Sequence, residues 1–427
     1  MNLITIRKMF ESKYGNLWII LSIILYRITL DYSYELVISD TFAYMGLGNN
    51  FNTSNYIISW CFLLTFVPFI TNMNRNITYS NCVLLLLSAI SLVPSTTLIA
   101  YLDFDAKFVL LLYIYWLCFF SYNAFFPKFQ IKTNSNKKLF LLISLLLCMS
   151  VLYISWKYTG FRFHFGLKDV YDLRLEAREY NVGAIVGYLA TAANKLLPII
   201  LIYCILKNKK IASIALIVVI LLNFGIEGSK GVLFSLFLCV LGFYFFRYKR
   251  TILVYGMLAL MSTWSIVEFI FLKKFFSGFI IYRMLLIPSQ LNYCYYDFVK
   301  DNELDFFRQG FLRHLGFESP YEGGIEFLIG SRYFNDYETR ANNGLFTDAY
   351  YNCGIIGILM FPLILIFLLK LIESVSNGVD ERLMFVPVYM VALAFLSTTF
   401  TTALLTHGLL LLMLMLYCIP RNKDVYQ

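Results

Sequence analysis

The chain has 427 residues, of which 59% are hydrophobic and 14% charged, with a net charge of +9 and a mean hydropathy of +0.69. Soluble globular proteins carry about 25% charged residues, so this chain has too few charges to cover a soluble protein of its size. The composition excludes a soluble enzyme, a disordered chain and a disulfide-rich secreted scaffold. It favours a polytopic membrane protein.

Twelve apolar runs follow one another along the chain, each close to the roughly 20 residues that a helix needs to cross a bilayer. Only helices satisfy their own backbone in lipid, and the runs lack the alternation of β-barrel strands. We therefore expect one all-α transmembrane domain over residues 1–427. The runs lie at residues 17–38, 56–71, 82–101, 106–126, 138–157, 184–206, 211–227, 229–247, 251–271, 346–371, 383–399 and 402–419.

The distribution of Lys and Arg predicts the orientation, because basic loops stay in the cytoplasm. With the N-terminus inside, the segments expected in the cytoplasm hold more than half of the 35 basic residues and only five of the 26 acidic ones. Both termini are then cytoplasmic. The first run carries charges and lacks a clear small-residue cleavage site, so we expect a span and not a signal peptide. The positive charge reflects topology and gives no reason to expect nucleic-acid binding.

Two of the segments expected on the outer side of the membrane are long. We call residues 158–183 the first charged segment and residues 272–345 the second charged segment. Both hold many cations on the side where the orientation rule disfavours them. A polyanionic ligand on that face would explain them. A solvated loop of mixed charge is the alternative, because about as many acidic residues are interleaved.

The first charged segment contains a short predicted helix over residues 169–180, with Asp169 as its cap. Tyr171, Arg174 and Arg178 fall on one face of it, about one turn apart. Planar guanidinium groups bind phosphate oxygens with two hydrogen bonds each, so this face suits a phosphate-containing ligand. The alternative is Glu–Arg pairing within the helix, which is worth little at a surface.

The second charged segment contains an aromatic and apolar stretch over residues 281–298, which includes Arg283. Such a stretch is expected to lie in the membrane interface or to re-enter the membrane, and its rings would suit sugar faces. Farther on, Arg313 and His314 lie next to Gly316. Histidine is the usual proton carrier near neutral pH, so all three histidines are candidates: His164, His314 and His407.

No metal or cofactor is expected. The three histidines are too far apart to form a zinc site by spacing, and the pair of Asp103 and Asp105 is a weak signal of a metal-dependent transferase. Charges inside or beside the spans are candidates for function or for structural pairing. Arg27, Asp31 and Glu35 follow one face of the first run, and Lys230 lies in a tight turn between two runs.

Several short segments together resemble the bacterial O-antigen and capsule repeat-unit polymerases of the Wzy type. The last of these segments is also similar to the start of a span in O-antigen ligases, where a histidine stands in place of Asn342. The resemblance covers most of the chain as an architecture. The segments are Tyr34–Gly46, Tyr171–Arg174, Gly228–Gly231, Arg283 with Pro288, and Asn342–Gly357.

The resemblance implies an inner-membrane glycosyltransferase of GT-C-like fold. Family members act on the periplasmic face on repeat units carried by undecaprenyl diphosphate, in lipopolysaccharide O-antigen or capsule synthesis. They transfer the growing glycan from its lipid diphosphate to a sugar hydroxyl of the next unit. The implied partners are these lipid-linked glycans, the lipid bilayer, a flippase and a chain-length regulator.

This chemistry gives the candidate residues their expected roles. Arg174, Arg178, Arg283 and Arg313 would stabilise the diphosphate leaving group, and Tyr171 and Lys230 would also bind substrate. His314 is expected to be the base, with Asp297 and Glu318 as alternatives. Asn343 and Asp348 would bind sugar hydroxyls. The main alternative function is a lipid-linked oligosaccharide flippase or another 12-helix transporter, although the long loops and the lack of internal repeats argue against it.

Overall fold

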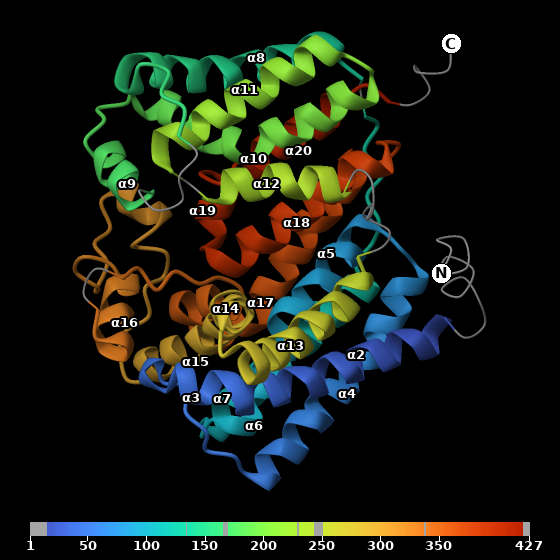
Figure 1. Cartoon of the computed structure of the whole chain (residues 1–427), viewed down its shortest axis with the longest axis vertical. Coiled ribbons are helices and arrows are strands. Elements are labelled where there is room, and N and C mark those ends of the chain that lie inside the picture. The colour runs from blue at the N-terminus through green and yellow to red at the C-terminus, as the bar shows by residue number, and fades with distance from the viewer. Residues whose placement is uncertain are drawn as a thin grey trace. The chain divides into compact units, whose positions relative to one another are not determined.

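The computed structural model describes residues 15–133, 135–164, 170–228, 230–242, 251–336 and 339–421. Within these ranges every regular element is helical. Ten helices are long and apolar enough to cross a membrane, which confirms the all-α polytopic fold (Figure 1). They are Asn16–Thr41, Thr53–Arg75, Tyr79–Tyr101, Ala106–Phe125, Lys137–Thr159, Ala184–Leu206, Lys210–Glu227, Leu253–Leu272, Phe346–Val375 and Phe400–Cys418.

These ten helices coincide with ten of the twelve predicted runs. The run at 383–399 forms α18 (Glu381–Ser397), a helix of 17 residues. The described part of the run at 229–247 forms α12 (Lys230–Leu241). Both runs are therefore helical. The described part of each helix is shorter than any of the ten helices above.

The residues divide by their contacts into two compact units. Unit 1 comprises residues 1–127, 251–368 and 395–400, and unit 2 comprises residues 128–250, 369–394 and 401–427. Each unit is built from separate stretches of the chain. The expectation that all 427 residues act as one transmembrane domain stays a prediction.

Unit 1 is built around the span Tyr79–Tyr101, whose side chains are all buried. Other helices of unit 1 surround this span, and α13 packs along α2 (Figure 1). The elements of the unit are α2 (Gly15–Ser33), α3 (Ser39–Thr41), α4 (Thr53–Arg75), α5 (Tyr79–Leu87), α6 (Val93–Tyr101), α7 (Ala106–Phe125), α13 (Leu253–Leu272), α14 (Phe276–Ile281), α15 (Ile287–Val299), α16 (Ile325–Phe334) and most of α17 (Phe346–Val375).

Polar residues just before the spans explain where these helices begin. The side chain of Asn52 accepts a hydrogen bond of 2.8 Å from the backbone N–H of Ser54, at the start of α4. Asp105 does the same for Lys107 at the start of α7, also at 2.8 Å. Such caps satisfy backbone N–H groups that a helix leaves unpaired. Asp105, one of the two acids in the weak metal signal of the sequence, therefore serves as the cap of α7.

The second charged segment contains a long helix that the hydropathy of the sequence did not predict as a span. Residues 276–299 form one continuous helix, in which α14 and α15 are joined by a π-helical turn, Tyr282–Leu286. Most of its side chains from Ile281 onward are buried, and it packs against α6 and α13 of the same unit. The aromatic stretch at 281–298 is thus part of the core of unit 1.

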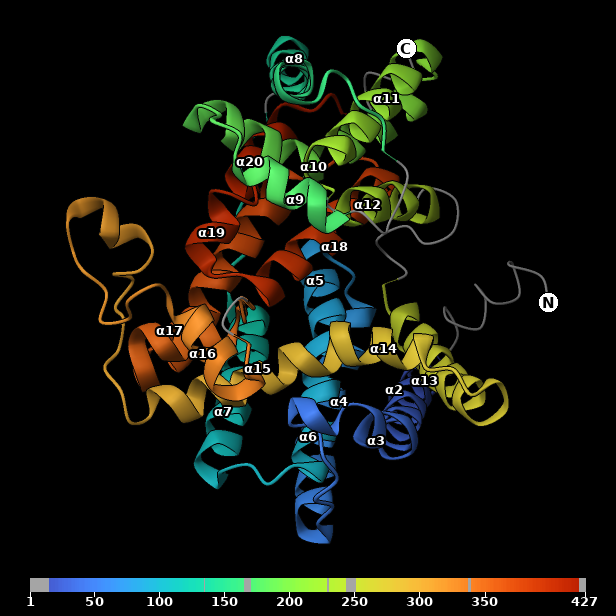
Figure 2. The ribbon, with the colours of Figure 1, turned by 60° about the vertical axis from the view of Figure 1, so that its left-hand side comes forward.

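Unit 2 packs α8, α10 and α11 against one another, with α9 lying against α11 (Figure 2). Its elements are α8 (Lys137–Ile154), α9 (Val170–Arg178), α10 (Ala184–Leu206), α11 (Lys210–Glu227), α12 (Lys230–Leu241), most of α18 (Glu381–Ser397), α19 (Phe400–Leu404) from its second residue onward, and α20 (Leu409–Cys418). The short helix expected at 169–180 is confirmed as α9. Its expected cap, Asp169, lies outside the described residues.

Candidate functional site

The candidate cations of the first charged segment lie in unit 2, on α9. Arg174 and Arg178 are both exposed, and Arg174 lies near enough to Glu227, the last residue of α11, to interact with it electrostatically. Arg178 has no hydrogen bond or ion pair with any residue that the structure describes. The side chains of Tyr171 and Lys230 are not among the described ones, so their expected roles stay predictions.

A hydrogen-bonded cluster beside α9 orders the first charged segment. Arg162 Nη2 contacts Glu176 Oε2 at 2.8 Å, and the Tyr180 hydroxyl donates to Glu176 Oε1 at 2.8 Å. Together the two hydrogen bonds hold the pKa of Glu176 below its usual range, and the bond from Arg162 has the larger effect. A Cβ at Gly225 of α11 would lie 2.4 Å from the Arg162 carbonyl oxygen, so only glycine allows this approach. The first charged segment therefore contacts α11 twice: through Arg162, before residue 165, and through α9, after residue 169.

Arg283 of unit 1 lies in the π-helical turn of the long helix 276–299. Its side chain is exposed, and it makes no hydrogen bond or ion pair within the described part of the chain. The preceding residue, Tyr282, is buried and stacks on Phe42, with ring centroids 4.1 Å apart and an interplanar angle of 1°. This stack fixes the turn and so determines where the guanidinium group emerges.

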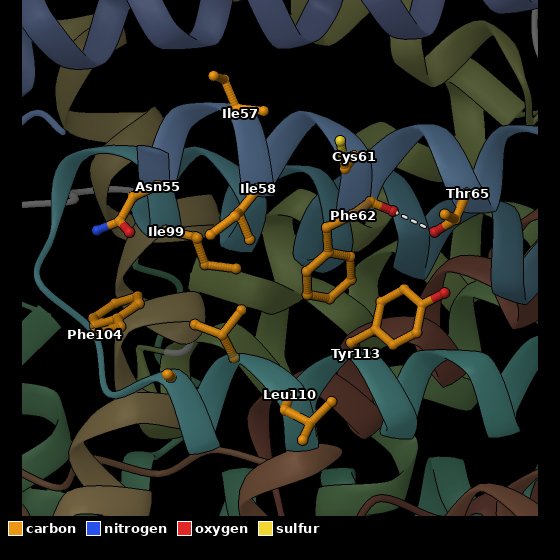
Figure 3. A pocket seen from close by; sticks show the side chains of 12 residues that line it. Asn55, Ile57, Ile58, Cys61, Phe62, Thr65, Ile99, Phe104, Leu110 and Tyr113 are labelled. Atoms are coloured by element: carbon orange, nitrogen blue, oxygen red, sulfur yellow. Dashed lines mark hydrogen bonds between the residues drawn. The ribbon is translucent and has the colours of Figure 1, made fainter. Parts of the chain in front are cut away.

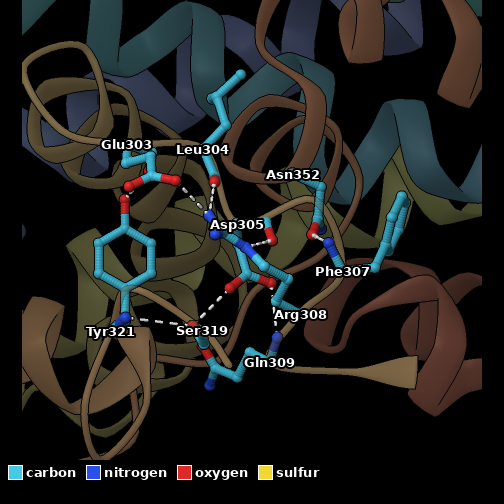
Figure 4. Close-up of polar contacts among 9 residues, drawn as sticks. All are labelled: Glu303, Leu304, Asp305, Phe307, Arg308, Gln309, Ser319, Tyr321 and Asn352. Atoms are coloured by element: carbon cyan, nitrogen blue, oxygen red, sulfur yellow. Dashed lines mark hydrogen bonds and ion pairs between the residues drawn. The ribbon is translucent and has the colours of Figure 1, made fainter. Parts of the chain in front are cut away.

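Arg313 and His314 lie in a single 3-10 turn, Phe311–Leu315, of the second charged segment. Figure 4 shows the polar contacts that anchor the chain on both sides of this turn. The anchor is Asp305, which is fully buried and accepts hydrogen bonds from Ser319 Oγ at 2.6 Å and from the backbone N–H of Gln309 at 2.8 Å. Asp305 thus ties together the chain before and after the turn.

The same anchored part is also joined to α17. The backbone N–H of Phe307 donates to Asn352 Oδ1 at 2.8 Å, and the N–H of Asp305 donates to the Tyr351 carbonyl at 3.0 Å. Phe306 and Phe307 both have positive φ, 51° and 62°, a strained backbone that persists only where surrounding contacts hold it. Arg313 itself is exposed, without a hydrogen-bond or ion-pair partner among the described residues. The His314 side chain is not described.

Asn343 and Asp348, the residues expected to bind sugar hydroxyls, are buried in unit 1. The Asn343 amide donates to Asn292 Oδ1 at 3.0 Å and to Thr347 Oγ1 at 2.8 Å. Asp348 accepts from Asn352 Nδ2 at 2.8 Å and from the backbone N–H of Phe400. Both side chains therefore hold elements of unit 1 together, and contact with a sugar stays a prediction.

The two alternative bases of the second charged segment differ in their surroundings. Glu318 is exposed. Asp297 accepts from Lys300 Nζ at 2.7 Å and from the Tyr333 hydroxyl at 2.6 Å. Burial alone would raise the pKa of Asp297, but the hydrogen bonds from Lys300 and Tyr333 outweigh it and hold the pKa below its usual range. A carboxylate stabilised in this way is a poor proton acceptor.

An apolar groove of about 530 Å³ lies between α4 and α7 in unit 1 (Figure 3). Few polar side chains line it, chiefly Asn55 and Thr65. On its rim, Ile57 and Leu110 are more than half exposed and Ile58 is half exposed. Because both helices are candidate spans, this exposed apolar surface suits hydrocarbon and not water. A flexible apolar chain, such as a lipid tail, fits this description.

Charged groups also occur within the spans, and the sequence identified only part of them. Arg27 is fully buried, and its Nε atom lies 2.9 Å from Asp31 Oδ1, whereas Glu35 is exposed. In unit 2, Lys195 of α10 contacts His407. Sequence reasoning singled out His407 but missed Lys195, although a lone lysine in the middle of an apolar run was a visible signal.

The described residues contain no group of three or more His, Cys, Asp and Glu side chains that could hold a metal ion. The candidate cations fall into one set in unit 1 (Arg283 and Arg313) and one set in unit 2 (Arg174 and Arg178), and each set is supported by its own network. No family model, no curated protein and no solved structure matches this chain.

Proposed function

We propose that this protein is a membrane-embedded glycosyltransferase that polymerises oligosaccharide repeat units carried on a lipid diphosphate such as undecaprenyl diphosphate. The observation that carries the proposal is that both charged segments present exposed arginines from ordered supports. Arg178, Arg283 and Arg313 have no carboxylate partner among the described residues. A protein that only needed an anchor would gain nothing from such groups.

The chemistry of the proposed reaction explains the residue type. The bond between the sugar anomeric carbon and the diphosphate oxygen breaks, and negative charge grows on the leaving diphosphate. Fixed guanidinium groups stabilise that charge because they need not reorganise during the step. The attacking sugar hydroxyl loses its proton, and His314 is our first choice of acceptor, because Asp297 is already held as a stabilised carboxylate.

The lipid portion of the donor has a counterpart in unit 1. The groove between α4 and α7 is apolar, open at its rim and long enough to involve residues from Asn55 to Thr65. In this proposal the groove holds part of the polyprenyl chain. The protein then acts at the outer face of a bacterial inner membrane, in O-antigen or capsule synthesis, beside a flippase and a chain-length regulator.

A lipid-linked oligosaccharide flippase or another transporter is the second candidate. It is favoured by the ionisable groups inside the spans, namely the Arg27–Asp31 pair and the Lys195–His407 contact, because such groups often mark transport paths. It is disfavoured by the long charged segments, which a transporter does not need.

One experiment separates the two functions. The purified full-length protein is reconstituted in proteoliposomes together with lipid-diphosphate-linked repeat units, and the products are separated on a gel. The polymerase proposal expects a ladder of longer glycans and release of free lipid diphosphate. Movement of the lipid-linked unit across the bilayer without elongation would overturn it and support the transporter.

A further inference from the structure

Lys195 lies at the midpoint of α10, a helix of 23 residues (Ala184–Leu206), and it is the only charged residue of that helix. A helix of this length spans the hydrocarbon core, so its midpoint lies near the centre of the bilayer. A charge at this depth is costly, and residues that carry one are usually partnered or functional. The identity of the partner therefore matters.

The partner of Lys195 is His407, which lies where the last span is interrupted. Helix α19 ends at Leu404 and α20 begins at Leu409, so residues 405–408 form a turn inside the span. Lys195 Nζ contacts His407 Nδ1 directly. Both side chains are half-buried. Interrupted helices inside a membrane place backbone and side-chain polar groups at a depth where ligands or ions bind.

The turn is packed closely on α10. Gly408 has a positive φ of 72°, and a Cβ added there would lie 3.0 Å from the Cβ of Ala192, one turn before Lys195. The His407 N–H donates to the Thr402 carbonyl at 2.9 Å. Beside the pair, Asn223 Nδ2 of α11 donates to Asn194 Oδ1 at 2.6 Å. The contact between Lys195 and His407 is thus supported from two helices.

No carboxylate compensates the pair among the described elements packed on α10. The one acidic residue on α8, α10, α11, α12 or α20 is Glu227, at the exposed end of α11, where Arg174 acts on it. The other titratable groups on these helices are cationic at the helix ends or are weak acids. They are Lys137, Lys138, Cys148 and Tyr153 of α8, Tyr188, Tyr203 and Cys204 of α10, Lys210 of α11, Lys230 and Cys239 of α12, and Tyr417 and Cys418 of α20.

We propose that Lys195 and His407 form a proton-binding site in the middle of unit 2, which gains and loses one proton in the physiological pH range. In the protonated state one proton lies between Lys195 Nζ and His407 Nδ1, and the pair carries one positive charge. Transfer of the proton between the two nitrogens leaves this charge unchanged. Loss of the proton to water leaves a neutral amine and a neutral imidazole, a state that apolar surroundings favour.

In this proposal the interruption of the last span responds to proton binding, and this role does not depend on glycan chemistry. Protonation changes the charge at the point where the turn 405–408 touches α10, so the position of the turn depends on the proton. A ligand that binds one arrangement better than the other shifts the equilibrium between them. The bound species is a proton, and the element that responds is the turn before α20.

The test is a titration of the full-length protein in lipid nanodiscs, labelled with ¹⁵N at lysine Nζ and followed by NMR from about pH 5 to about pH 9. We expect one lysine signal to change from the ammonium to the amine form in this range and to be missing from Lys195→Met. Lys209→Met, at an exposed lysine of the same unit, is the matched control and retains the signal.

His407→Gln is the second variant, because glutamine can accept a hydrogen bond from Lys195 but does not titrate. We expect the midpoint to move by at least about half a pH unit when the two groups share a proton. The proposal is overturned if Lys195 stays an ammonium ion over the whole range or if His407→Gln leaves the midpoint in place. A midpoint that follows the chloride concentration at constant ionic strength also overturns it, because the bound species is then an anion. Lys195→Gln replaces the methionine variant if that variant does not fold.

Discussion

Arg27 and Asp31 lie one turn apart in α2, and a contact of 2.9 Å joins their side chains, which are only 0% and 6% exposed. Thr97 and Ser59 accept further hydrogen bonds from the guanidinium group, at 3.0 and 3.1 Å. The Arg27 guanidinium also lies 5.1 Å from the ring centroid of Trp60. The pair therefore joins α2, α4 and α6 near the core of unit 1.

Replacing Arg27 by Met should destabilise unit 1, because Asp31 is left as a buried charge without its partner. The expected loss in the free energy of unfolding is about 3–5 kcal/mol. Thermal unfolding of the purified protein in detergent measures it. The double variant Arg27→Met with Asp31→Leu removes both charges and should recover most of the loss. Equal melting temperatures for the single variant and the wild type would contradict this account.

Gly357 of α17 should not tolerate a larger side chain. A Cβ at this position would lie 1.9 Å from the Ala349 carbonyl oxygen, because α17 bends at Gly354, where φ is 55°. We expect Gly357→Ala to cost about 1–3 kcal/mol of unfolding free energy. Gly256→Ala is the matched control, since nothing lies within 4 Å of a Cβ at this position in α13. If both variants melt alike, the close approach has no energetic effect.

The anchoring of α9 should weaken at acid pH. The pKa of Glu176 is lower in the folded protein than in an unfolded chain, because Arg162 and Tyr180 hydrogen-bond to its carboxylate. This contribution is fully present above the unfolded value of about 4.3 and is lost as the pH falls through the lower, folded value. Hydrogen exchange of residues 170–180 measures it. The difference between wild type and Glu176→Gln should be largest near neutral pH and vanish in acid; a constant difference would contradict the prediction.

Arg283→Ala and Arg313→Ala should each reduce glycan elongation by about 10²-fold in the proteoliposome assay, because each removes a donor to the leaving diphosphate. Their folding should be unchanged, since both side chains are exposed and without partners in the described chain. Arg340→Ala is the matched control: Arg340 is exposed as well, but its guanidinium lies 5.0 Å from the ring centroid of Phe327. Normal polymer length and yield with both variants would show that these arginines do not bind the donor.

The spans were predictable because a run of about 20 apolar residues has few other stable structures in a membrane. The helix 276–299 was not predicted as a span-like element, because it contains Arg283, Gln290 and Asn292, which lower its hydropathy. In the structure Gln290 and Asn292 meet protein partners instead of lipid, whereas the Arg283 side chain is exposed. For example, Gln290 Nε2 donates to the Met45 carbonyl at 2.8 Å. Hydropathy describes the preference of a helix for lipid. It therefore does not identify a helix that is packed mainly against other helices.

The candidate site shows the same division. Exposed arginines were recognisable from their residue type and from their place outside the apolar runs. The buried contacts were not, because Asp305 finds Ser319 and Asn352 finds Phe307 only after distant stretches of chain have folded together. Residues 343 and 348 look like binding residues in the sequence, yet each forms hydrogen bonds within unit 1.

The discontinuous course of unit 1 has a consequence for its biosynthesis. The fully buried span Tyr79–Tyr101 is covered in part by the helix 276–299, which is made roughly 200 residues later, a delay on the order of 10–40 s at ordinary translation rates. During that time Ser88 and Ser91 lack the partners that later helices supply, because the Ser88 hydroxyl lies 2.6 Å from the Tyr255 hydroxyl and the Ser289 hydroxyl donates to the Ser91 carbonyl at 3.4 Å. A chain that terminates near residue 250 would lack this helix and should be degraded rather than accumulate as a folded fragment.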